Sequence, residues 1–283
     1  MPDYSHLEPL FLTGLADYHV HCNFSIDAEG SIDDYCQAGL RRGLAEMCFT
    51  THYDSNPAGK GADSFIRVDG KNTPATVDNL APYVDAVAAA HDKYFSQGLA
   101  VTLGLEFGWY AGCEEEVQKL QDRYPIEYMM AGIHELDDLC FCCHNRFEAC
   151  FSRYSVEEAV EKYAGDVCRA AASGLFRTIA HLDYLRKYGC EFYGERLEQL
   201  LLERSGDMFA ALKDSETTLE INTSAMRKGL DGYFPGMAMA NRARRAGVDI
   251  RYLGSDAHRP EDVAFDFDAA AALVNSSIVA CED

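Results

Sequence analysis

The sequence lacks the long apolar run that a membrane-spanning helix requires. No stretch of about 18 apolar residues occurs in the 283-residue chain. A secretion signal is also missing, because the apolar residues 10–12 are too few and Asp3 and Glu8 stand where basic residues are favoured. We therefore expect a cytoplasmic protein with no membrane partner.

Positive charge is scarce as well. Lys and Arg number 25 against 46 Asp and Glu, which gives a formal net charge of -21. A nucleic-acid binder needs a basic stripe that displaces counterions from phosphates. The two small basic clusters, at residues 41–42 and 242–245, are interpreted as solvated helix faces. This excludes a nucleic-acid partner, but a small anionic substrate stays possible where bound metal ions outweigh the global field.

Cysteines are plentiful but do not indicate a disulfide framework. Their number, 11, is odd, and no export signal precedes them. One cluster stands out, Cys140, Cys142, Cys143 and His144, with Cys150 following. A structural zinc site usually has two ligand pairs, and this cluster has no clear second pair. The sequence therefore favours loop cysteines without a metal role.

Short apolar runs alternate with amphipathic helical segments along the whole chain. This alternation predicts an α/β fold with a parallel sheet and helices outside it. Nothing divides the chain, so we expect residues 1–283 to form a single domain. The runs cover residues 14–20, 44–50, 100–105, 128–133, 177–180, 218–221 and 250–253.

Capping residues delimit the helices between these runs. Ser31 predicts an N-cap and Gly43 a C-cap for a helix over 31–42, Ser155 begins a capping box, and Pro260 is expected at the first position of the last helix. The other helices are expected over 76–97, 114–123, 195–212 and 236–246, with the Ser155 helix closing at 174. The segment 54–74 is expected to be a long irregular loop, and residues 135–154 a second long polar connection that contains the cysteine cluster.

Potential metal ligands stand at the carboxyl ends of these runs. Such ends converge on one mouth of a parallel barrel, where active sites lie. Six of the nine histidines occupy these positions, whereas His6, His91 and His144 fall in a tail, a helix and a loop. The candidate ligands are His19, His21, Asp27, His52, Glu106, His134, His181, Asp256 and His258. Imidazole mixed with carboxylate suits zinc, manganese or iron, and about three ligands per ion indicates a trinuclear site.

Seven segments together resemble the PHP (polymerase and histidinol phosphatase) superfamily, and within it the stand-alone histidinol-phosphatase type. They are DYHVHCNFSIDAEG (17–30), FTTHYDSNP (49–57), GLEFGW (104–109), AGIHELDD (131–138), IAHLDYLRKYG (179–189), LEINTSAMRK (219–228) and LGSDAHRPEDVAFDF (253–267). The resemblance covers essentially the whole chain in order. It implies a distorted seven-stranded (β/α) TIM-like barrel, in agreement with the seven apolar runs.

The resemblance also implies how the ligands are shared. Glu106 would bridge two ions, one held by His19, His21 and Asp256 and the other by His134 and His181, while Asp27, His52 and His258 would hold a third. Two departures from the family pattern occur. Asp27 stands where such phosphatases often carry histidine, and the segment after His134 replaces a more aromatic stretch with the cysteine cluster.

The expected chemistry is metal-dependent hydrolysis of a phosphomonoester. Three divalent ions and three carboxylates would leave a local charge of about +3, and a metal-bound hydroxide would attack phosphorus. Asp256 and His258 are the candidate proton-transfer groups. The resemblance places Arg227 at the phosphate, with Lys228, Arg186, Lys187 and Arg259 as further candidates. The expected substrate is L-histidinol phosphate, which would place the enzyme in histidine biosynthesis.

Three alternatives remain open at this point. A related phosphoesterase could act on nucleotides or another small phosphorylated metabolite. An amidohydrolase-type enzyme also begins with two histidines on an early strand, but it typically uses a bridging lysine where this chain has Glu106. A non-catalytic metal-binding module would not need ligands at every motif. Metal analysis with a chelator-reversible phosphatase assay separates the three.

Overall fold

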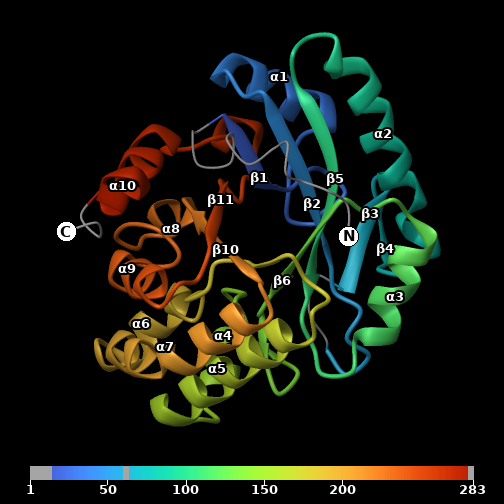
Figure 1. Cartoon of the computed structure of the whole chain (residues 1–283). Helices are drawn as coiled ribbons and strands as arrows, with labels where there is room; N and C mark the ends of the chain where they lie inside the picture. The colour runs from blue at the N-terminus through green and yellow to red at the C-terminus, as the bar shows by residue number, and fades with distance from the viewer. Residues whose placement is uncertain (1–14, 60–63, 280–283) are drawn as a thin grey trace.

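The computed structural model describes residues 15–59 and 64–279 (Figure 1). Seven strands form one parallel sheet in the order β1-β2-β5-β6-β9-β10-β11. A parallel bridge between Val20 and Ala257 joins the two outer strands, so the sheet is nearly closed into a barrel. The strands are β1 (Ala16–Val20), β2 (Glu46–Tyr53), β5 (Ala100–Gly108), β6 (Tyr128–Gly132), β9 (Thr178–Ile179), β10 (Thr218–Asn222) and β11 (Ile250–Gly254). This confirms the predicted fold class, a single-domain α/β barrel.

Helices surround the barrel, as Figure 1 shows, and bury the outer faces of the strands. Strands covered on both faces read as continuous apolar runs, which is why the sequence revealed them. The longer helices are α1 (Ile32–Arg42), α2 (Ala81–Phe95), α3 (Glu114–Arg123), α5 (Val156–Ala172), α7 (Arg196–Asp214), α9 (Met237–Arg245) and α10 (Phe267–Val279). Among the described residues, no helix combines the length and the apolar character needed to cross a bilayer.

Local capping places α1 and α5 as predicted. Ser31 accepts a hydrogen bond from the Asp34 amide, and Ser155 accepts one from the Glu158 amide. Each acidic side chain bonds back to the amide of its serine, so both helices start with a capping box. Gly43 ends α1 at a φ of 77°, in the left-handed region that glycine adopts without strain.

The connections over 54–74 and 135–154 both contain regular structure, so the expectation that the first is irregular was wrong. The first holds the hairpin of β3 (Phe65–Val68) and β4 (Lys71–Pro74), although residues 60–63 lie outside the described part. The second holds the hairpin of β7 (Glu135–Leu136) and β8 (Leu139–Cys140), followed by α4 (Phe147–Phe151). The second is not a polar connection, because Phe141, Phe147 and Phe151 are buried.

The helices differ from the prediction in four further places. A 3₁₀ turn, η2 (Asp78–Leu80), precedes α2. Pro260 begins only a short 3₁₀ turn, η3 (Pro260–Asp262), because Ala264 and Asp266 adopt positive φ angles and α10 starts at Phe267. Two short helices, α6 (Arg186–Tyr193) and α8 (Ser224–Arg227), were not predicted.

A layer of tyrosines fills the barrel below the carboxyl ends of its strands. The ring centroids of Tyr18, Tyr128 and Tyr252 lie 4.8–5.1 Å apart, with Cys48 and Met130 in the same buried cluster. Edge-to-face aromatic pairs add about 0.5–1.5 kcal/mol each beyond their burial. This layer gives the site above it a rigid floor.

Candidate metal centre

Glu106 lies at the centre of the barrel mouth. It is 1% exposed and sits near the end of β5, the longest strand of the sheet. Ring nitrogens of five histidines lie close to its two carboxylate oxygens: His52 (3.1 Å), His19 (3.2 Å) and His21 (3.4 Å) at Oε2, and His181 (2.9 Å) and His134 (3.3 Å) at Oε1. Burial alone would raise the pKa of Glu106, but the surrounding imidazoles hold it well below its usual value. The carboxylate is therefore ionised and positioned to bridge cations.

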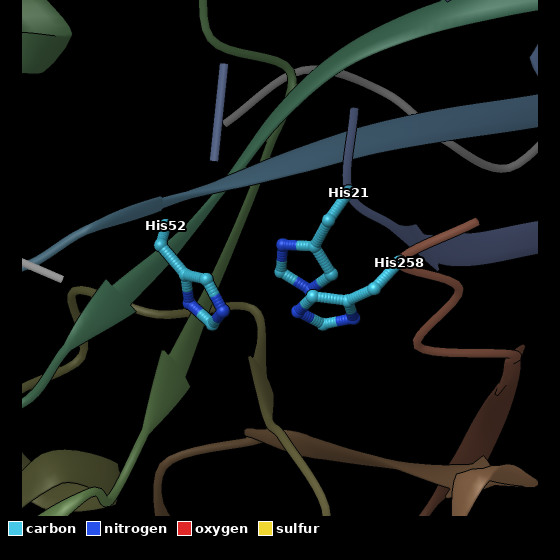
Figure 2. A group of neighbouring side chains, drawn as sticks. All are labelled: His21, His52 and His258. Atoms are coloured by element: carbon cyan, nitrogen blue, oxygen red, sulfur yellow. The ribbon is translucent and has the colours of Figure 1, made fainter. Parts of the chain in front are cut away.

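A second group gathers three imidazoles from three different elements. His21 follows β1, His52 lies in β2 and His258 follows β11, and Figure 2 shows their rings close together. The His21 ring centroid is 4.2 Å from that of His52 and 4.3 Å from that of His258. Burial and these two neighbours lower the pKa of His21 well below its ordinary value. A neutral imidazole is the form that binds metals.

Asp256 connects this group to the cations of the pocket. Its Oδ1 lies 3.4 Å from His21 Nε2 and 3.8 Å from His19 Nε2. Its Oδ2 accepts hydrogen bonds from Lys228 Nζ (2.5 Å) and Ser224 Oγ (2.9 Å). Although burial would raise the pKa of Asp256, Lys228 and the imidazoles hold it well below its usual range. These contacts favour the ionised form of Asp256.

Asp27 occupies the outer rim of the cluster. Its Oδ2 is 3.2 Å from His258 Nε2 and 3.9 Å from His52 Nε2. The side chain is 50% exposed, in contrast to the buried Glu106. Burial works against its charge, but His258 and then His52 lower the pKa of Asp27 further than burial raises it. The rim position leaves this end of the cluster open to solvent and substrate.

Two candidate ligands adopt an unfavourable backbone conformation. His181 and Asp256 have positive φ angles of 32° and 50°, which are uncommon for residues other than glycine and cluster at functional sites. Gly132 makes room for two other candidate ligands, because a Cβ there would lie 2.6 Å from His134 Nε2 and 2.7 Å from Glu106 Oε1.

The donor set fits divalent metal ions. The Nε2 of His21 lies 3.4 Å from both Glu106 and Asp256 and is buried without a hydrogen-bond partner in the described part of the chain. Buried polar groups normally have partners, so this atom fits a metal ligand. Four overlapping groups each bring three donor atoms within 4.8 Å of one another: His19, His21 and Asp256; His19, Glu106 and His181; His52, Glu106 and His134; and His21, His52 and His258. The mixture of nitrogen and oxygen donors suits zinc, manganese or iron.

The predicted basic residues are divided between two places. Arg227, Lys228, Lys187 and Arg259 line the pocket of about 500 Å³ above the cluster. Arg186 does not reach it. Its side chain is buried and forms ion pairs with Asp183 (3.2 Å) and Glu198 (2.7 Å).

Arg227 holds the backbone beside Asp256. Its Nη2 donates to the carbonyl oxygens of Ser255 and Asp256 at 2.6 and 3.1 Å. Its Nε lies 3.5 Å from Asp262 Oδ2, and Nη1 is buried without a hydrogen-bond partner among the described residues. Arg227 therefore fixes the backbone at Asp256 at the edge of the pocket.

Sequence reasoning missed several residues that shape the site. Glu220, a charged residue inside the apolar sixth run, accepts from the His181 amide at 2.9 Å and lies 3.0 Å from His19 Nδ1. Tyr184 stacks on His181 at 3.8 Å between centroids. Of the three histidines set aside, His144 lines the pocket, His91 lies on α2, and His6 lies outside the described residues. The carboxylate within an apolar strand was the one available signal.

Replacing Glu220 with Gln tests its role as a positioning residue. Its carboxylate holds His19 Nδ1, so that Nε2 faces Glu106 and Asp256. Loss of such a partner typically lowers metal affinity or activity about 10–100-fold. We expect metal affinity, measured by competition with a chromophoric chelator, to fall in this range while the circular dichroism spectrum stays native. Unchanged affinity would show that His19 is oriented without it.

Comparison with known proteins agrees with this geometry. The profile of the PHP domain family matches residues 17–224, well over half of the chain. The chain belongs to the PHP domain family. Among its relatives, a protein of Deinococcus radiodurans named "Probable histidinol-phosphatase" is 29% identical over 256 residues, 90% of this chain and 91% of the relative. A protein of Lactococcus lactis subsp. lactis named histidinol-phosphatase is 26% identical over 86% of this chain and 83% of its own.

A solved structure shares the fold of this PHP domain. The crystal structure of histidinol phosphate phosphatase from Lactococcus lactis, complexed with zinc, L-histidinol and phosphate, superposes with a TM-score of 0.70. It covers 93% of this chain and 94% of that one, at 20% identity. The family profile ends at residue 224, and Asp256 and His258 lie beyond it. Both residues follow β11, the strand whose end is bridged to β1, and this closure brings them to the other candidate ligands.

Proposed function

We propose that this PHP protein is a metal-dependent phosphomonoesterase whose substrate is L-histidinol phosphate. The observation that carries the proposal is the ring of five imidazoles around the buried carboxylate of Glu106, at the floor of a pocket lined by cationic side chains. The names of its relatives support the choice of substrate. We infer that the whole chain works as one domain, because the site uses both its first and its last strand.

We further propose that the centre holds three divalent ions of zinc, manganese or iron. His19, His21 and Asp256 would hold one ion, and His134 and His181 a second, with Glu106 between them. Asp27, His52 and His258 would hold the third at the rim. The four overlapping donor groups support more than one ion, because no single ion can accept every donor. When bound, such ions supply Lewis acidity toward phosphoryl oxygens and lower the pKa of water.

The side chains around the centre suit a phosphate dianion. The side chains of Lys228, Lys187 and Arg227 line one pocket, although the chain as a whole carries a net charge of -21. Arg259 stands further out, 58% exposed, and pairs with Glu29 at 3.5 Å. Donors fixed in a buried site stabilise developing negative charge more strongly than solvent does. The positive charge in the pocket would attract a small phosphate ester, whereas the acidic surface would repel a long polyanion.

Asp256 and His258 were the two candidates for proton transfer. Asp256 accepts hydrogen bonds from Lys228 Nζ and Ser224 Oγ, and these contacts favour its ionised form. His258 is 25% exposed, lines the pocket and has its Nε2 3.2 Å from Asp27. Its Nδ1 lies 3.0 Å from the Asp256 carbonyl oxygen, so both ring nitrogens are engaged once Nε2 holds the rim ion. We therefore propose His258 as a ligand of the rim ion, together with Asp27, and not as the general acid.

The test is removal and return of metal followed by a substrate panel. Dialysis against a chelator should abolish phosphatase activity, and one of zinc, manganese or iron should restore it, with elemental analysis giving about three ions per chain. In the panel, L-histidinol phosphate should give the highest kcat/KM, above nucleoside monophosphates and sugar phosphates. Equal or faster turnover of an unrelated ester would overturn the substrate and leave the chemistry. Activity that survives metal removal would overturn the chemistry itself.

A further inference from the structure

The loop after β8 gathers three thiols that the proposed reaction does not use. Cys140, Cys142 and Cys143 place their Sγ atoms within 4.8 Å of one another, and the Cys140 and Cys142 Sγ atoms are 3.6 Å apart. Cys140 and Cys142 are 8% and 9% exposed, whereas Cys143 is half-buried. In sequence they looked like unrelated loop cysteines, but the fold brings them to one point.

The spacing of these sulfurs matches a shared ion better than a disulfide. Zinc–sulfur bonds of about 2.3 Å in tetrahedral geometry place two sulfurs about 3.8 Å apart. A disulfide needs about 2.05 Å. The observed 3.6 Å between Cys140 and Cys142 is close to the first value. Thiolate sulfur selects soft and borderline ions, in contrast to the oxygen and nitrogen donors around Glu106.

The supporting structure is rigid. Asp137 and Asp138 form the two-residue turn of the β7–β8 hairpin with φ angles of 46° and 64°, and the Phe141 amide donates to the His134 carbonyl at 3.1 Å. Phe141 is fully buried against Phe151 of α4. The loop therefore presents its thiols without help from an ion, as a preformed metal site requires.

The charge balance around the thiols also suits an anionic cluster. Three thiolates around a divalent ion carry a net charge of -1. Lys187 lines the same pocket as Cys142 and Cys143, and its Nζ is held by the Tyr184 hydroxyl at 3.1 Å. The ammonium of Lys187 can offset that charge. The fourth coordination position of such an ion would face the pocket. His144, the next residue in the chain, lines the same pocket.

We propose that Cys140, Cys142 and Cys143 form a separate site for one thiophilic ion, zinc in class, on the wall of the substrate pocket. It differs from the proposed catalytic centre in its donors, so it can be loaded and measured independently of activity. An ion there would add a cross-link to the loop between β8 and α4, which forms part of the pocket wall. The proposal does not depend on which phosphate ester the enzyme uses.

The test uses cadmium as the probe, because thiolate-bound cadmium gives a charge-transfer absorption in the ultraviolet that nitrogen and oxygen ligands do not. The reduced, metal-free full-length protein should develop this band with saturation at one equivalent, and zinc should displace it. Thiol titration should show three cysteines protected by cadmium. The Cys140→Ser, Cys142→Ser, Cys143→Ser triple variant should lose the band.

Two further variants make the result decisive. Cys168→Ser with Cys190→Ser, which removes two partly exposed cysteines elsewhere, should keep the full band. Cys143→Ser alone, chosen in case the triple variant does not fold, should weaken cadmium binding by more than the roughly 10–100-fold typical of outer-shell changes. An undiminished band in the folded triple variant, or no band in the wild type with all thiols still titratable, would overturn the site.

Discussion

Replacing Glu106 with Gln should reduce phosphatase activity by at least ~10³-fold, beyond the roughly 10–100-fold that outer-shell substitutions cost. Gln keeps the shape of the side chain but removes the charge that faces five imidazoles within 3.4 Å. Without that charge, neighbouring cations would no longer share a bridge and would repel each other. We expect elemental analysis to show a loss of metal in parallel with the loss of kcat/KM.

Glu46 provides a matched control in the same barrel. It is 2% exposed at the start of β2, among the tyrosines, where it accepts hydrogen bonds from Tyr18 (2.5 Å) and Thr102 (3.1 Å). Glu46→Gln should lower the melting temperature yet leave metal content and kcat/KM close to wild type. If both variants lost activity equally, the effect at Glu106 would be one of folding rather than of metal binding.

Replacing Lys228 with Met should lower kcat/KM by ~10²–10³, the effect of removing one fixed donor from a transition-state anion. Lys228 is half-buried at the pocket and contacts Asp256 and Ser224. Burial lowers its pKa, and Asp256 counteracts that shift. Met preserves the apolar stem but removes the charge, so the phosphate should lose a partner while the metal ligands stay in place.

Three measurements separate this effect from damage to the metal centre. Metal content should be unchanged, and inorganic phosphate should inhibit the variant more weakly than the wild type. Lys93→Met is the control, because Lys93 forms an exposed ion pair with Asp33 on the outer helices and should have wild-type kinetics. Normal phosphate inhibition in the Lys228 variant would contradict a role in binding phosphate.

The strands could be predicted because burial on both faces leaves a clear pattern in the sequence. The ends of those strands then located the candidate ligands, since parallel strands share one mouth. Arg186 shows the limit of this reasoning. It follows a strand as Arg227 and Lys228 do, but only the fold reveals that Asp183 and Glu198 bind it away from the pocket.

Local sequence signals were ambiguous for elements whose structure depends on tertiary packing. Helix α6 contains Gly189, a poor helix former, and the structure explains it: a Cβ there would lie 2.6 Å from Leu197 Cδ2 on α7. The β3–β4 hairpin carried a readable signal, Asp69 and Gly70, which have φ angles of 50° and 74° as a two-residue hairpin turn requires. The convergence of the three thiols could not be predicted, since it depends on the path of a loop.

The join between β1 and β11 has a consequence for assembly. Asp17 accepts a hydrogen bond from the Ser255 amide, 238 positions away. Backbone hydrogen bonds from the His21 amide to Ala257 (2.9 Å) and from the Asp256 amide to His19 (2.7 Å) also join the two edges. His19 and His21 stand on one side of this seam, Asp256 and His258 on the other. Cations bound between them would connect the first strand of the barrel to the last. The stability of the junction between β1 and β11 would therefore depend on the concentration of metal ions. In the metal-free protein, the junction between β1 and β11 would be the first part of the barrel to open.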